Sequence, residues 1–362
     1  MLVITRFLWP LPWPLAVKIA LAVLMLVASQ FQYWSKLSSG SIFAPEFPRA
    51  IVILFNWAGG AILFLALMQL LADVALFALW LAPGRTAVMP VEMRYAMAAM
   101  AMILAAVGVY NATRVPALKD VRIDIAGLPP QFDGYTLVQL TDLHISRLFP
   151  TAWTQAVVDR TNALDVDLIV ITGDVIDGSL AMRRADVEPL RGLRARDGVF
   201  MGPGNHEYFL GYQEWMRHFA EMGMYILAND HVVLRRQGGS LVLAGVTDRT
   251  APATGMTPPD LAAALAGAPT GVPILLLDHQ PGPARTAAAR GVALQLSGHT
   301  HGGMIPGLDR LVAMGNSGFV SGRYAVEGMT LYVNNGTGIW PGFAMRLGRP
   351  AELTRITLRR KS

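Results

Sequence analysis

The chain of 362 residues contains no cysteine and has few charged residues. Without cysteine it forms no disulfide bonds, no thiolate metal sites and no cysteine nucleophile. Charged residues make up only 15% of the sequence and hydrophobic residues make up 53%, whereas an ordinary soluble protein carries about 25% charged residues. Because the apolar excess lies mainly in the first third of the chain, we expect two parts of different character.

The sequence also lacks a long run of basic residues. Its net charge is +5, but lysines and arginines are scattered, and the densest group is the terminal "LRRKS". We therefore expect no nucleic-acid partner. A basic balance of this kind suits a protein that lies beside an anionic membrane surface.

The first third contains apolar segments with the length of membrane spans, which need about 20 residues. These segments are residues 15–34, 50–82 and 95–112. The second segment is long for one span and short for two. Asn56, Gly59 and Gly60 would mark a break, so three spans and four spans both stay open. We predict that residues 1–114 form a multi-pass anchor in the bacterial cytoplasmic membrane, with the lipid bilayer as a partner.

The sequence does not determine the orientation of this anchor in the membrane. In a three-span arrangement Arg6, Arg85 and Arg94 lie on one side of the membrane, and five basic residues lie on the other: Lys36, Arg49, Arg114, Lys119 and Arg122. The positive-inside rule therefore gives no clear answer. The side of the membrane on which the rest of the chain lies is not determined.

Residues 120–362 follow a different pattern. Short apolar runs bounded by Asp, Gly and Pro alternate with helical patterns, which predicts an α/β domain. The late segments "LYVNNGTG" and "ELTRITLRR" both read as strands of a second sheet.

Several predicted strands end in a residue that binds metals or transfers protons. In chain order these residues are Asp142, His144, Asp174, Asn205, His206, His279, His299 and His301. The carboxyl ends of strands in open α/β sheets converge on one crevice, so these side chains are expected to meet. Oxygen and imidazole ligands suit Mn, Fe or Zn. Their number exceeds one tetrahedral site and fits two divalent ions that share a carboxylate.

Two of these histidines stand one residue apart in the stretch "LSGHTHGG". If the H-T-H segment is strand-like, alternate side chains point the same way, and His299 and His301 face the metals together. The flanking Gly298, Gly302 and Gly303 would let the loop approach closely.

The motifs "DLH", "GDVID", "GNHE", "LLLDHQP" and "GHTH" resemble, in this order, the five motifs of the calcineurin-like metallophosphoesterases. "LSGHTHGG" and "LYVNNGTG" resemble more narrowly the membrane-associated bacterial branch, which includes transmembrane proteins with a metallophosphoesterase domain and is related to UDP-2,3-diacylglucosamine hydrolases. The resemblance implies N-terminal transmembrane helices followed by a four-layer α/β/β/α sandwich.

The resemblance also implies a role for each residue of the set. The first metal would be held by Asp142, His144 and His301, and the second by Asn205, His279 and His299. Asp174 would bridge the two ions. His206 would contact the phosphate and protonate the leaving oxygen, and Asp177 would orient His206. Arg147 and Arg346 are further candidates for contact with the substrate phosphate.

The function implied is metal-dependent hydrolysis of a phosphodiester or pyrophosphate bond through a metal-bridging hydroxide. The substrate would be a phosphorylated small molecule or a lipid, and the membrane anchor favours a lipid-linked one. One alternative is a UDP-2,3-diacylglucosamine pyrophosphohydrolase of lipid A synthesis. Another is a non-catalytic membrane scaffold or sensor with the same fold. The oligomeric state is not determined by the sequence.

Overall fold

A computed structural model describes residues 1–81 and 88–361, and the chain divides into two compact units. The helical unit contains Met1–Ala112 and Pro341–Leu347, and the α/β unit contains Thr113–Trp340 and Gly348–Ser362. Arg85, which entered the argument on orientation, lies outside the described residues. The predicted change of character near residues 114–120 therefore falls close to the observed division, but one short late segment belongs to the helical unit.

The helical unit contains two helices that are long and apolar enough to cross a membrane. These are α3 (Arg49–Trp80) and α4 (Val91–Thr113). A third candidate is the pair α1 (Leu15–Ser29) and α2 (Phe31–Ser39), which is bent by 57° at Gln30 and forms a broken span or a re-entrant loop. A short π-helix, η1 (Val3–Leu8), precedes them.

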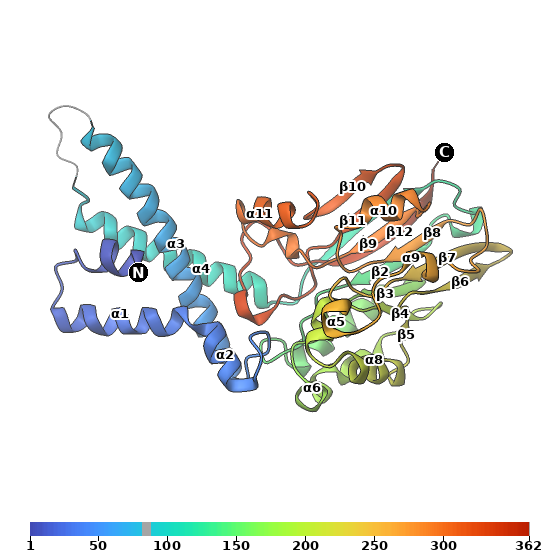
Figure 1. The fold of residues 1–362 in the computed structure, drawn as a ribbon, viewed down its shortest axis with the longest axis horizontal. Coiled ribbons are helices and arrows are strands. Elements are labelled where there is room, and N and C mark those ends of the chain that lie inside the picture. Colours follow the sequence, from blue (N-terminus) through green and yellow to red (C-terminus); the bar gives the residue numbers. More distant parts are fainter. Residues whose placement is uncertain (82–87, 362) are drawn as a thin grey trace. The chain divides into compact units, whose positions relative to one another are not determined.

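The helix α3 is continuous through Asn56, Gly59 and Gly60 (Figure 1). The break considered at these residues is therefore absent, and the segment is one long helix of 32 residues. At 1.5 Å per residue such a helix is about 48 Å long, which exceeds a hydrocarbon core of about 30 Å. Its ends would then reach the interfaces.

The segment Pro341–Leu347 packs among the helices of the helical unit. The buried Asn56 side chain of α3 donates to Pro341 O at 2.8 Å, and its Oδ1 accepts from Ala344 N at 2.5 Å. Gly60 and Gly108 leave space for Met345, whose side chain a Cβ at either glycine would overlap. Non-helical backbone inside a helical membrane unit needs such internal hydrogen bonds, because lipid offers none.

The α/β unit contains two six-stranded sheets. The first has the order β1-β12-β2-β3-β4-β5, and the second has the order β10-β11-β9-β8-β7-β6. The strands of the first sheet are β1 (Leu118–Ile125), β2 (Thr136–Leu140), β3 (Leu168–Thr172), β4 (Val199–Gly202), β5 (Tyr225–Ile226) and β12 (Leu353–Arg360). The strands of the second are β6 (Asp230–Arg236), β7 (Gly239–Gly245), β8 (Ile274–Leu277), β9 (Leu294–Ser297), β10 (Gly322–Val326) and β11 (Met329–Val333).

The prediction for the two late segments was half right. β11, from "LYVNNGTG", lies in the second sheet, but β12, from "ELTRITLRR", lies in the first, between β1 and β2. It runs parallel to β1 and antiparallel to β2. Its buried Leu353, Ile356 and Leu358 supply part of the core at that position. A local pattern of alternation cannot distinguish the two sheets, because both have one face on the same core.

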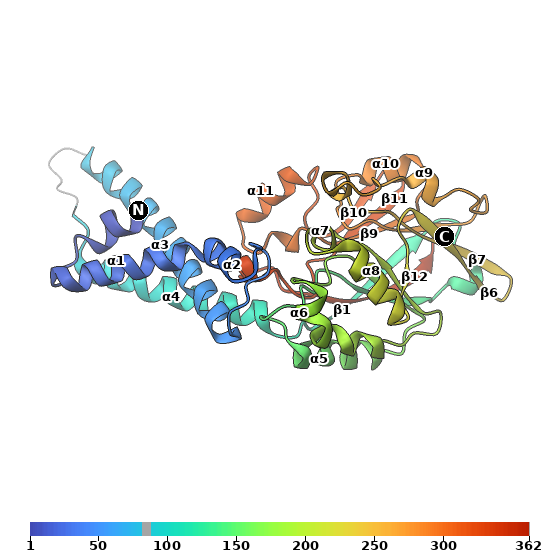
Figure 2. The same ribbon diagram turned by 60° about the horizontal axis from the view of Figure 1, so that its bottom comes forward.

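Helices cover the outer faces of both sheets (Figures 1 and 2). Leucines and isoleucines from the two inner faces form the central core, which includes Leu137, Leu168, Leu243, Leu275 and Leu296. One outer layer contains α5 (Thr151–Asn162), α6 (Leu180–Val187) and α8 (Tyr212–Glu221). The other contains α9 (Leu261–Ala264) and α10 (Ala284–Ala289). The predicted four-layer α/β/β/α sandwich is therefore confirmed.

Candidate metal centre

The predicted donor residues lie just beyond the carboxyl ends of five strands. Asp142 and His144 follow β2, and Asp174 and Asp177 follow β3. The remaining donors follow β4, β8 and β9: Asn205, His206, His279, His299 and His301. The two sheets bring these strand ends together, and the donors form clusters.

The first donor cluster consists of Asp142, His144 and His301, whose potential ligand atoms all lie within 4.8 Å of one another. His144 Nε2 lies 3.2 Å from His301 Nε2, and His301 Nε2 lies 3.6 Å from Asp142 Oδ1. The Asp142 and His144 side chains are fully buried.

The second donor cluster consists of Asp174, His279 and His299. The amide oxygen of Asn205 lies among them, 3.1 Å from His279 Nε2 and 2.9 Å from His299 Nδ1. Burial and the neighbouring His279 lower the pKa of His299 to about 3. A neutral imidazole keeps its lone pair available for a cation.

Asp174 lies between the two clusters. Its Oδ2 is 3.2 Å from His279 Nε2 of the second cluster and 3.8 Å from His144 Nε2 of the first. One carboxylate thus approaches donors of both clusters. The donor set, with two carboxylates, four imidazoles, one amide oxygen and no sulfur, fits divalent ions such as Mn, Fe or Zn. Buried acids gathered this closely also favour bound positive charge.

The backbone of both clusters is strained. Five donors have left-handed φ angles: Asp142 (50°), His144 (46°), Asp174 (54°), His299 (69°) and His301 (50°). Residues other than glycine rarely adopt this conformation, which costs about 1–3 kcal/mol each and collects at functional sites. The surrounding structure must therefore hold these turns in place.

Glu207 is one residue that holds them, and sequence reasoning missed it. Its buried carboxylate accepts hydrogen bonds from Gly204 N at 2.7 Å, Asp174 N at 3.0 Å and Val175 N at 2.7 Å. It thus ties the turn after β3 to the turn after β4. The signal was present in the quoted motif "GNHE", where the glutamate follows the two assigned residues.

Glycines allow the loops to approach closely at two points. A Cβ at Gly204 would overlap the Asp174 carboxylate, and a Cβ at Gly298 would overlap Asp142 and Thr141. Gly298 was predicted to have this role. Neither position has space for a larger residue.

His206 stands beside the clusters and is held by Asp177. Asp177 Oδ1 accepts from His206 Nδ1, and Asp177 Oδ2 accepts from His144 Nδ1 at 3.0 Å. Burial opposes protonation of His206, yet the Asp174 and Asp177 carboxylates raise its pKa to about 9. Burial likewise opposes ionisation of Asp177, but His144 and His206 hold the pKa of that carboxyl below its usual value. Asp177 therefore orients a donor of the first cluster as well as His206.

The "HTH" segment is not strand-like, and that prediction is wrong. β9 ends at Ser297, both histidines have left-handed φ angles, and His301 begins the 3-10 helix η5 (His301–Gly303). The turn separates the two rings, so His299 lies in the second cluster and His301 in the first. The amide N–H of His299 donates to both Asp142 oxygens at 3.0 Å, which shapes this turn.

The two candidate arginines differ in their exposure. Arg147 is exposed on the segment between β2 and α5. Arg346 is 1% exposed, belongs to the helical unit, and donates its backbone N–H to Gly108 O at 3.0 Å. Its backbone hydrogen bond and its burial are thus part of the packing of the segment Pro341–Leu347.

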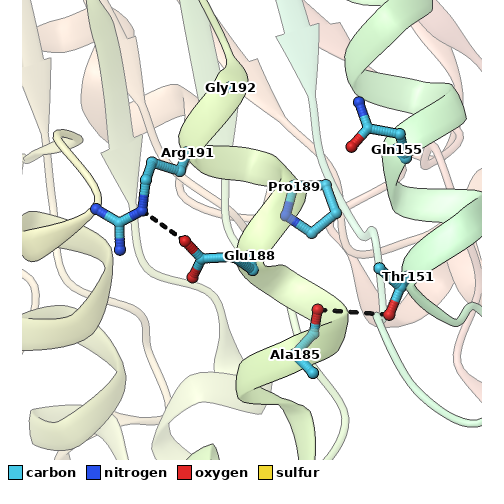
Figure 3. A pocket seen from close by; sticks show the side chains of 7 residues that line it. All are labelled: Thr151, Gln155, Ala185, Glu188, Pro189, Arg191 and Gly192. Carbon is cyan, nitrogen blue, oxygen red and sulfur yellow. Dashed lines mark hydrogen bonds and ion pairs between the residues drawn. The ribbon is translucent and has the colours of Figure 1, made fainter.

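A surface groove of about 660 Å³ lies between α5 and the end of α6 (Figure 3). Its polar groups bond to one another, with Arg191 Nε 2.7 Å from Glu188 Oε1 and Thr151 Oγ1 donating to Ala185 O. It contains none of the donor residues.

Comparison with known proteins agrees with this geometry. The sequence model described as calcineurin-like phosphoesterase matches residues 135–303. A "Transmembrane protein with metallophosphoesterase domain" from Danio rerio is 35% identical over 269 residues, which cover 71% of this chain and 60% of that protein. An "Uncharacterized metallophosphoesterase Cj0846" from Campylobacter jejuni is 31% identical over 264 residues, covering 72% of this chain and 68% of that protein.

Among solved structures, a 5'-nucleotidase precursor from Thermus thermophilus is 20% identical with a TM-score of 0.40, covering 62% of this chain and 54% of that one. The chain spans 60% of the length of the Danio rerio relative. The sequence identities and the matched family model together carry the assignment. The chain belongs to the calcineurin-like phosphoesterase family.

Proposed function

We propose that this protein is a membrane-anchored phosphoesterase with two divalent metal ions, which hydrolyses a phosphodiester or pyrophosphate bond of a lipid-linked substrate. The observation that carries the proposal is the pair of donor clusters with Asp174 between them and the buried His206–Asp177 pair beside them. Metal ligands alone would suit a structural site. A histidine held in the protonated form beside them is what a hydrolase needs.

Asp142, His144 and His301 would hold one ion, and Asn205, His279 and His299 the other, with Asp174 shared. Bound divalent ions would supply positive charge to the phosphoryl oxygens and acidity to a water molecule. The chain's own part is to hold the seven donors together, five of them in strained turns, and to keep most of them buried. Because the Asn205 oxygen is uncharged, it adds a ligand without weakening the positive charge of the site.

His206 supplies the proton for the leaving oxygen. Asp177 accepts a hydrogen bond from His206 Nδ1, so the Nε2–H of the ring remains for the substrate. His206 Nε2 lies 3.9 Å from Asp174 Oδ2. Expulsion of an alkoxide or phosphate leaving group requires an acid in the transition state. Although burial opposes it, the two carboxylates keep His206 protonated near neutral pH.

The lipid-linked substrate is inferred from the helical unit. Two apolar helices of span length lie in the same chain as the donor clusters, and the chain returns to that unit at Pro341–Leu347. An enzyme so attached is confined near the bilayer, where lipid substrates are concentrated.

The test is hydrolysis of bis-p-nitrophenyl phosphate by the purified full chain with added Mn, followed by a screen of lipid phosphodiesters and pyrophosphates. We expect activity that a chelator abolishes and that Mn restores, together with bound metal measured by elemental analysis. Asp174→Ala should lose both metal and activity, whereas His206→Ala should keep metal and lose activity on phosphodiesters with an alkoxide leaving group. Full activity in chelator or in Asp174→Ala, or full activity of His206→Ala on an alkoxide substrate, would overturn the mechanism.

A further inference from the structure

The helix α11 (Leu308–Gly315) differs from every other α-helix that the structure describes in the α/β unit, because it buries no residue. Leu311 is 64% exposed and Met314 is 78% exposed. Residues three apart lie on the same side of a helix, so Leu308, Leu311 and Met314 form one apolar stripe. Water-exposed leucine and methionine at this density are unusual on a helix that nothing covers.

The charges of α11 suit an anionic surface. Arg310 is exposed and lies next to Met314 around the helix. The only acid of the helix, Asp309, forms an ion pair with Arg349. The outward face therefore presents apolar side chains beside one positive charge, Arg310, and this combination suits the interface of an anionic bilayer.

The helix is attached to the metal-site loop. Gly303 closes η5, which begins at His301, and has a φ of 73°. A Cβ at Gly303 would overlap the backbone and side chain of Asp309. The start of α11 thus packs directly on the turn that carries a donor of the first cluster.

The helix is also tied to the chain close to the helical unit. Arg349, the partner of Asp309, follows Leu347 by two residues, and Leu347 is the last residue of the segment that belongs to the helical unit. Two extended residues span about 7 Å. The ion pair therefore joins α11 to a residue that lies two positions in the chain after a segment of the helical unit.

We propose that α11 is an interfacial helix that rests on the same bilayer that α3 and α4 cross, with lipid covering Leu311 and Met314. It forms a lip beside the His301 turn, over which a lipid-linked phosphate passes from the membrane to the metal site. The inference rests on the membrane anchoring in the proposed function, and its lipid contact does not depend on the reaction.

The lack of cysteine allows a direct test with the full chain. Met314→Cys is labelled with bimane and reconstituted in nanodiscs of phosphatidylethanolamine and phosphatidylglycerol, and quenching by nitroxide lipids is measured. Leu71→Cys, 71% exposed on α3, is the control for lipid exposure, and Met182→Cys, 43% exposed on α6, is the control for solvent exposure. We expect strong quenching at position 314 by nitroxides near the headgroups.

Two outcomes of this experiment would overturn the proposal. One is quenching at position 314 as weak as at position 182, while the probe at position 71 is strongly quenched and so shows that the nitroxide lipids reach a lipid-facing site. The other is a probe at position 314 that nitroxide lipids do not quench but whose fluorescence changes when the ratio of protein to lipid is raised. A second copy of the chain would then cover the helix.

A second arm measures the consequence for substrate access. The double variant Leu311→Gln with Met314→Gln should hydrolyse bis-p-nitrophenyl phosphate as the unchanged chain does, but a bilayer-embedded phosphodiester several-fold more slowly. Equal rates on the embedded substrate would overturn the role as a lip. If the unchanged chain hydrolyses neither substrate, the proposed function fails, while the quenching result still decides whether lipid covers α11.

Discussion

Asp177 provides the sharpest test of the site, because one buried carboxylate serves two histidines. It accepts from His206 Nδ1 and from His144 Nδ1, and it has no exposed surface. Asp177→Asn keeps the size and removes the charge. It should therefore lower the pKa of His206 and weaken the orientation of His144 without leaving a cavity.

The size of the effect follows from the pKa of His206, which burial opposes and the two carboxylates raise to about 9. If removal of the Asp177 charge returns it to the ordinary value of about 6.5, the protonated fraction at pH 8 falls about 30-fold. Bound cations would lower both pKa values, so the prediction concerns the variant relative to the unchanged chain. Loss of a group that orients a metal ligand costs a further factor of about 10–100 in metal affinity.

The assay compares two leaving groups at two pH values, with metal content measured on each sample. An alkoxide needs the proton from His206, whereas p-nitrophenolate leaves without it. We expect the variant to lose about 30-fold on a dialkyl phosphodiester at pH 8, less at pH 6, and much less on bis-p-nitrophenyl phosphate. Asp167→Asn, a buried acid outside the donor clusters, is the matched control. An equal loss on both substrates at both pH values, with metal retained, would refute the reasoning.

Three further predictions concern the loops and the packing. Gly298→Ala should lose bound metal by elemental analysis, because its Cβ would overlap Asp142; retained metal would contradict this. Asn56→Leu should lower the unfolding midpoint in detergent, since it leaves Pro341 O and Ala344 N unpaired at about 1–3 kcal/mol each; the exposed Leu71→Ala is its control. Burial raises the pKa of Asp167, but Thr136 and Arg236 lower it overall, so its stabilisation is present at neutral pH and is lost as pH falls through the carboxylate range. Asp167→Asn should therefore destabilise at pH 7 by about 1–3 kcal/mol and progressively less as the pH falls through the carboxylate range, as measured by thermal unfolding.

Much of the candidate site could be predicted because metal ligands are chemically distinctive. Carboxylates, imidazoles and an amide at the ends of apolar strands indicate a common crevice, whatever the path between them. The structure brings together all seven predicted donors, and His206 stands beside them. The α/β class and the apolar helices could also be predicted from the sequence, since both depend on the local periodicity of hydrophobic residues.

Other features depended on contacts between distant residues. The Glu207 carboxylate accepts hydrogen bonds from backbone N–H groups after another strand. The sequence around a glutamate does not show which distant backbone groups it will bind. The sequence also did not predict that β12 pairs with β2 or that Pro341–Leu347 packs against Asn56. Both contacts join residues far apart in the chain, and the local pattern is compatible with other partners.

The sequence by itself determined which chemical groups the centre contains and the order of the strands that carry them. These features depend on residue type and on the local period of apolar residues. The family resemblance implied how the groups divide between two ions, but only the tertiary structure shows the turns that produce this division. The left-handed turn at His299 and His301 sends two neighbouring imidazoles to different clusters, and Asp174 lies between them. Backbone turns held by hydrogen bonds from other strands set that division, and no local pattern specifies them.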